Sequence, residues 1–114
     1  MRRGGLIAGA TGASAILLAC AAPGARAPLV DGPVADAARN SGSLDAAIRG
    51  RELYVTTCTD CHGAVRPASL TEAQWEKVLP RMARSAGIGA AAEADLRAYI
   101  AAALAAAASP PPTR

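Results

Sequence analysis

The chain has 114 residues, among them three cysteines and one histidine, and a formal net charge of +3. This length suits one small domain, and two of the excess positive charges are Arg2 and Arg3 at the start of the chain. Without these two, acidic and basic residues nearly balance. No lysine- and arginine-rich block and no interleaving of basic and aromatic residues occurs, so the composition does not indicate nucleic-acid binding.

The N-terminal segment has the layout of a secretory signal, because Arg2 and Arg3 precede an uncharged stretch over residues 4–19. That stretch is short for a membrane-spanning helix. Residues 17–20, Leu-Leu-Ala-Cys, resemble a bacterial lipobox, although leucine is less usual at position 18. We therefore expect residues 1–19 to be a lipoprotein signal peptide and Cys20 to carry the lipid, which places the exported protein on the periplasmic side of a bacterial membrane. In the alternative, Cys20 belongs to an ordinary signal that is discarded.

Residues 20–42 follow as a segment rich in alanine, proline, glycine and aspartate, without a helical or alternating pattern of apolar residues. Such a composition is typical of flexible linkers. We expect this segment to be a tether between the lipidated cysteine and a folded domain.

Three helices are predicted in the domain, which we expect over residues 43–107. The first runs from Ser43 to about Thr57, with Leu44, Ile48 and Val55 on one stripe. The third covers about residues 91–107 and is rich in alanine, which favours helix; its expected core residues are Leu96, Tyr99, Ile100, Ala103 and Leu104. No segment resembles a strand, and residues 108–114 are expected to be a disordered tail.

The second predicted helix begins at Thr71, because Thr71 and Gln74 have the spacing of a capping box. Its apolar positions, one helix face at i, i+3, i+4 and i+7, are Trp75, Val78, Leu79 and Met82. Pro80 removes a backbone donor and predicts a kink or break. Gly87 is expected to end this helix as a C′ glycine.

One motif carries chemistry: residues 58–62 read Cys-Thr-Asp-Cys-His, and C-x-x-C-H is the pattern of covalent attachment of a c-type haem. Two thiols at this spacing, Cys58 and Cys61, can each bond one vinyl group of the porphyrin. The adjacent His62 can then ligate the iron as its proximal ligand. His62 is the only histidine, so no other residue competes for this role.

The motif allows two other interpretations. A zinc site would need further cysteine or histidine ligands after residue 62, and the sequence has none. A thiol oxidoreductase of the thioredoxin type would need alternating strands and helices around the motif. A domain of about 65 residues is also too small to be comfortably stable on its own apolar core. We therefore predict an all-α domain whose helices wrap around one covalently attached haem c.

Two segments resemble class I c-type cytochromes over about residues 44–104. Residues 50–58, which lead into the motif, place a glycine and an aromatic residue as that family does, and residues 95–100 resemble its C-terminal helix. The resemblance implies that the two terminal helices cross, with Gly50 allowing the close approach of Tyr99. A small residue at a tight helix crossing is physically reasonable, because the side chains at the contact set the distance between helix axes.

The sixth iron ligand departs from the usual class I pattern, because Met82 follows His62 by only 20 positions. This compact arrangement is similar to haem subunits of periplasmic dehydrogenases, including sulfite dehydrogenases, and to some free small cytochromes. Met82 is the only methionine beyond Met1 and is predicted to be the distal ligand. The alternatives are a methionine that only packs in the core, or a vacant or water-bound iron position.

Tyr54 and Trp75 are expected to pack against the haem. Six basic residues flank the predicted site and form either a basic collar that docks an acidic partner or an ordinary solvated surface: Arg49, Arg51, Arg66, Lys77, Arg81 and Arg84.

The expected function is one-electron transfer by a membrane-anchored monohaem cytochrome, which would exchange electrons with redox partner proteins or serve as the non-catalytic haem subunit of a dehydrogenase. The sequence offers no catalytic group beyond the haem. Two alternatives remain open: a haem module that binds a small gas such as nitric oxide at an open sixth position, and a haem-free thiol oxidoreductase.

Overall fold

The computed structural model describes residues 26–60, 63–110 and 113. The expected signal peptide, lipidated Cys20, and the motif residues Cys61 and His62 lie outside the described residues. Within them the fold is all-helical without a strand, which confirms the predicted class.

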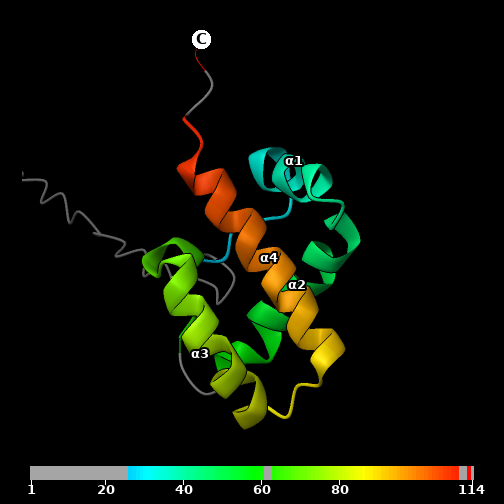
Figure 1. The fold of residues 1–114 in the computed structure, drawn as a ribbon, viewed down its shortest axis with the longest axis vertical. Coiled ribbons are helices and arrows are strands. Elements are labelled where there is room, and N and C mark those ends of the chain that lie inside the picture. The colour runs from blue at the N-terminus through cyan, green and yellow to red at the C-terminus, as the bar shows by residue number, and fades with distance from the viewer. Residues whose placement is uncertain (1–25, 61–62, 111–112, 114) are drawn as a thin grey trace, which may run out of the picture.

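The described residues form four α-helices and two short 3₁₀ turns. The helices are α1 (Gly32–Asn40), α2 (Leu44–Thr56), α3 (Glu72–Ser85) and α4 (Ala90–Ala108), and the turns are η2 (Cys58–Asp60) and η3 (Pro67–Ser69). Figure 1 shows α4 as the long central helix, with α1 and α2 on one side of it and α3 on the other. Helix α4 is therefore the element on which the other three α-helices pack.

Helix α3 begins and ends as the sequence predicts. The Thr71 hydroxyl accepts the Gln74 N–H at 3.2 Å, and the Gln74 side chain accepts the Thr71 N–H at 2.8 Å, which completes the capping box. At its other end Gly87 has φ +68°. The N–H of Gly87 bonds to the carbonyl of Arg84, and that of Ile88 to the carbonyl of Ala83. These two bonds form a Schellman motif.

Pro80 does not break α3, because the helix continues through it to Ser85. The lost hydrogen bond is offset by packing, since Trp75, Leu79 and Ala83 on one face of this helix are buried. The break considered from the sequence is therefore wrong.

Helix α1 corrects the prediction of a flexible tether over residues 20–42 for the part that it covers, Gly32–Asn40, whereas residues 20–25 lie outside the described residues. Pro33 lies in its first turn, where its missing N–H costs nothing, and Gly42 ends it at φ +69°. Val34 and Ala38 on this helix pack with Ala47 of α2 and Ala102 of α4. The small apolar residues that looked like linker composition are instead the buried face of a helix.

The crossing of α2 and α4 confirms the expected contact between Gly50 and Tyr99. A Cβ atom on Gly50 would lie 2.0 Å from the Asp95 carbonyl oxygen and 2.9 Å from the Tyr99 Cβ. No side chain fits there, so glycine is required for the approach of the two helices. The expected α2 stripe is wrong at Ile48, which is 51% exposed, because α2 turns its small residues toward α4.

The expected core face of α4 is confirmed: Leu96, Tyr99, Ile100 and Ala103 are buried, and Leu104 is half-buried. The segment before α1 is fixed to this frame by its backbone. The Tyr99 hydroxyl donates to the Pro28 carbonyl at 2.9 Å, and Arg51 donates to the carbonyls of Pro28 and Ala27 at 3.0 and 3.3 Å. No helix in the described part of the chain combines the length and the apolar character needed to cross a membrane.

Candidate functional site

A cavity of about 200 Å³ opens where α2 ends, between η2, the segment after residue 62 and one face of α3. Cys58, the first residue of the C-x-x-C-H motif, is half-buried in its wall. The lining combines residues from α2, the motif, the following segment and α3: Tyr54, Cys58, Thr59, Ala64, Val65, Leu70, Trp75, Val78 and Met82.

The few polar groups in this wall are already engaged within the chain. The Thr59 hydroxyl donates to the Val55 carbonyl at 2.9 Å, and the Tyr54 hydroxyl donates to the Val65 carbonyl. Burial raises the pKa of the Tyr54 phenol and of the Cys58 thiol above their ordinary values. The remaining lining is apolar, so the cavity suits a large apolar group bonded to Cys58.

Two aromatic side chains hold the wall that follows the motif. Trp75 on α3 donates its indole Nε1–H to the Pro67 carbonyl at 2.8 Å, and Tyr54 on α2 holds the Val65 carbonyl. The two rings meet edge to face, with centroids 6.3 Å apart. Together they connect α2, α3 and the segment that begins directly after His62.

The apolar stripe of α3 serves two surfaces at once. Trp75 and Leu79 are buried in the main core with Leu96 and Ile100 of α4. Val78 and Met82 are half-buried and line the cavity. The Met82 thioether is therefore in the same cavity wall as Cys58, on a different element of the chain.

Four of the residues predicted from the sequence meet in this cavity: Tyr54, Cys58, Trp75 and Met82. Thr59, Ala64, Val65 and Leu70 were not predicted to take part. Their signal in the sequence is weak, because it consists only of their nearness to the motif and of the apolar character of Val65 and Leu70.

The donors present suit a c-type haem. Covalent attachment through a vinyl group needs a cysteine thiol at the cavity wall, and Cys58 is there; a thioether iron ligand needs a methionine in the same space, and Met82 is there. The apolar lining is what a porphyrin face would contact. In the described residues no cluster of three or more histidine, cysteine, aspartate or glutamate side chains could hold a metal ion instead.

Comparison with known proteins gives one family. The family model for dihaem cytochrome c matches residues 54–113, which include the motif, α3 and α4. The family description refers to two haems, whereas the printed sequence contains one C-x-x-C-H motif. No curated protein and no solved structure matches the chain.

Proposed function

Because this chain belongs to the dihaem cytochrome c family, we propose that it transfers single electrons through one haem c bonded to Cys58 and Cys61. His62 is the proximal iron ligand in this proposal and Met82 the distal one. The observation that carries it is the shared cavity of Cys58 and Met82, lined by apolar side chains.

Haem supplies the redox chemistry, an iron that cycles between the ferrous and ferric states. The chain supplies the setting. Trp75 and Tyr54 hold the segment after His62 by its carbonyl groups, and the apolar lining would exclude water from the faces of a bound haem. A thioether ligand and a dry surrounding both favour ferrous iron and raise the reduction potential.

The distal ligand is tested by Met82→Leu in the haem-loaded protein. Leucine nearly preserves the packing volume, so the fold and the haem attachment should be kept. Loss of the thioether should turn the iron to a high-spin or water-ligated state, lower the reduction potential and allow carbon monoxide to bind. The optical spectrum and a potentiometric titration measure these changes.

Leu79→Met is the matched control, because Leu79 lies on the same helix but is buried in the core rather than in the cavity. It should leave the spectrum unchanged. If Met82→Leu keeps the wild-type spectrum and potential, Met82 only packs against its neighbours. A high-spin wild-type protein that binds nitric oxide would favour the gas-binding function instead.

One haem per chain is part of the proposal, since the sequence holds a single motif. The intact mass should exceed that of the polypeptide by one haem, and a denaturing gel should retain haem staining. Cys58→Ser with Cys61→Ser should abolish both signals. Two haems bound per chain would contradict it.

We also propose that the protein is exported and held by a lipid on Cys20, which rests on the lipobox-like residues 17–20. The intact mass of membrane-extracted protein should then show acyl chains on Cys20. Cys20→Ser should release processed protein from the membrane, because acyl chains supply the membrane affinity. A soluble form that begins after residue 20 would contradict this anchor.

A further inference from the structure

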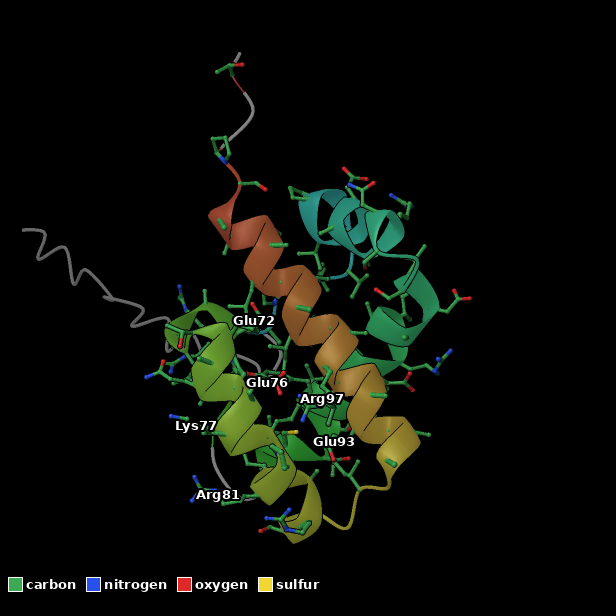
Figure 2. The ribbon with its side chains drawn as sticks, in the orientation of Figure 1. Glu72, Glu76, Lys77, Arg81, Glu93 and Arg97 are labelled. Atoms are coloured by element: carbon green, nitrogen blue, oxygen red, sulfur yellow. The ribbon has the colours of Figure 1, made fainter. Side chains whose placement is uncertain are left out.

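The charged residues of α3 are divided between two sides of the helix. Figure 2 shows Glu72 and Glu76 on the side toward α4, together with Arg97 and Glu93, whereas Lys77 and Arg81 point away from α4. Arg97 joins the acidic side to α4, because it donates to Glu76 at 2.8 Å and to Glu93 at 2.9 Å.

The basic side of α3 borders the cavity. With 3.6 residues per turn, Arg81 lies about 60° around the helix from Val78 and Lys77 about 100°. Met82, which lines the cavity together with Val78, lies on the other side of Val78 from these two basic residues. Arg84 follows Lys77 and Arg81 at helical spacing. On the opposite wall Arg66 adjoins Val65, a lining residue that is 36% exposed.

We call Arg66, Lys77, Arg81 and Arg84 the basic rim. All four are exposed, and among the described residues no ion pair includes any of them. The other members of the collar considered from the sequence are engaged elsewhere, since Arg49 pairs with Asp95 at 2.9 Å and Arg51 holds the Pro28 carbonyl. Two haem propionates would neutralise only part of this charge.

We propose that the basic rim and the exposed apolar lining it borders form the docking surface for an acidic redox protein. This rests on the proposed electron transfer and adds the chemistry of the partner. Electron transfer needs the cofactor edge close to the partner, and a rim of one charge around an apolar centre steers such an encounter. The charge complementary to this rim is a carboxylate-rich surface.

The test uses the haem-loaded protein, with a net-negative blue-copper protein as the electron-transfer probe in stopped flow. At low ionic strength Lys77→Glu with Arg81→Glu should slow the second-order rate about tenfold. Salt should slow the wild type and bring the two rates together. Lys77→Gln with Arg81→Gln should give an intermediate rate. This charge-neutralising variant replaces the charge-reversal variant in the test if the latter does not fold. The midpoint potentials of all variants are measured as well, because an unchanged potential shows that a slower rate comes from weaker docking and not from a smaller driving force.

Arg39→Glu is the control, because Arg39 is an exposed cation on α1 whose only ion pair among the described residues is with the exposed Asp36. It should leave the rate unchanged. A rate that is equally affected by the control, or insensitive to the rim and to salt, overturns the docking surface while electron transfer stands. A protein with no reversible potential at an electrode overturns the proposed function and the docking surface with it.

Vesicles of phosphatidylcholine with 30 mol% phosphatidylglycerol test the competing partner, an anionic membrane. Under our proposal, any binding of the lipid-free chain to these vesicles should not depend on the basic rim. The Lys77→Glu, Arg81→Glu variant should therefore bind the vesicles no less than the wild type does. Rim-dependent vesicle binding together with a rate to the copper protein that ignores the rim would assign this surface to the membrane and overturn the proposal.

Discussion

The two sides of α4 are packed in different ways. On the α2 side, Gly50 lets the helices approach until Tyr99 is completely buried, and no space is left for a Cβ atom at residue 50. On the α3 side, Trp75 and Leu79 reach the core, but Val78 and Met82 face a cavity of about 200 Å³. The α2–α4 crossing is filled by protein atoms, whereas a space is left between α3, the end of α2 and the segment after residue 62.

This difference gives the two sides different tasks. The α2–α4 crossing is a close-packed frame, and the end of α2 leads from it directly to Cys58. The wall on the α3 side is held by the hydrogen bond of Trp75, by the contact of its ring with Tyr54 and by the ion pair of Arg97 with Glu76. That ion pair is partly exposed to solvent. A small domain that lacks enough core of its own is expected to leave such a space for its cofactor.

Tyr99→Ala should have the largest effect, because it opens a cavity in the close-packed side. We expect a loss of about 4 kcal/mol of unfolding free energy, measured by denaturant unfolding of the haem-loaded protein. Tyr99→Phe is the matched control, since it keeps the ring and removes only the hydrogen bond to Pro28, for about 1 kcal/mol. Equal losses for both variants would show that the ring does not fill the crossing.

For Gly50→Ala, the sign of the change in unfolding free energy tests the close packing of α2 against α4. Helix propensity alone predicts a gain of about 1 kcal/mol, whereas the crossing predicts a loss of about 2 kcal/mol, because the new Cβ would meet the Asp95 carbonyl. Gly89→Ala is the control, since a Cβ there meets nothing within 4 Å. A Gly50→Ala protein that melts at or above the wild-type temperature would show that α2 and α4 do not meet at this point.

Trp75→Phe tests the α3 side and should cost about 1 kcal/mol through the lost hydrogen bond to Pro67. Because that bond holds the segment after His62, the haem absorption bands and the reduction potential should also shift. Tyr99→Phe removes a hydrogen bond of the same kind from the other side and should leave both unchanged. Identical spectra for wild type and Trp75→Phe would show that the hydrogen bond of Trp75 does not influence the haem iron.

The smallest expected effect concerns the ionisation of the buried Tyr99 phenol, which leaves stability unchanged at neutral pH and lowers it in alkali. Burial raises the pKa of Tyr99 to about 12, whereas an unfolded tyrosine ionises near pH 10. The folded chain keeps a proton that the unfolded chain releases, so stability is complete below about pH 10 and falls as the pH rises toward 12. Unfolding followed by tyrosinate absorbance should show this decline, and Tyr99→Phe should reduce it. A stability independent of pH up to about 11.5 would contradict the burial of the phenol.

Several features of the fold could be predicted because their causes are local. The capping box of Thr71 and Gln74 and the C′ glycine Gly87 depend on neighbouring backbone groups, and both are present. Gly50 and Tyr99 were paired through a resemblance, and the crossing confirms them. Helix α1 was missed although Pro33 and Gly42 mark its ends, because its buried face consists mainly of alanines, which carry little hydrophobic pattern.

The sequence by itself determined the all-helical class, the ends of α3 and the C-x-x-C-H motif with its chemistry, because each depends on residues close together in the chain. Only the tertiary structure decided that α1 packs on α4, that Val78 and Met82 share a cavity with Cys58, and that Arg49 and Arg51 turn away while the basic rim stays exposed. These outcomes depend on which faces of distant helices meet, and that is set by packing, which local spacing does not encode.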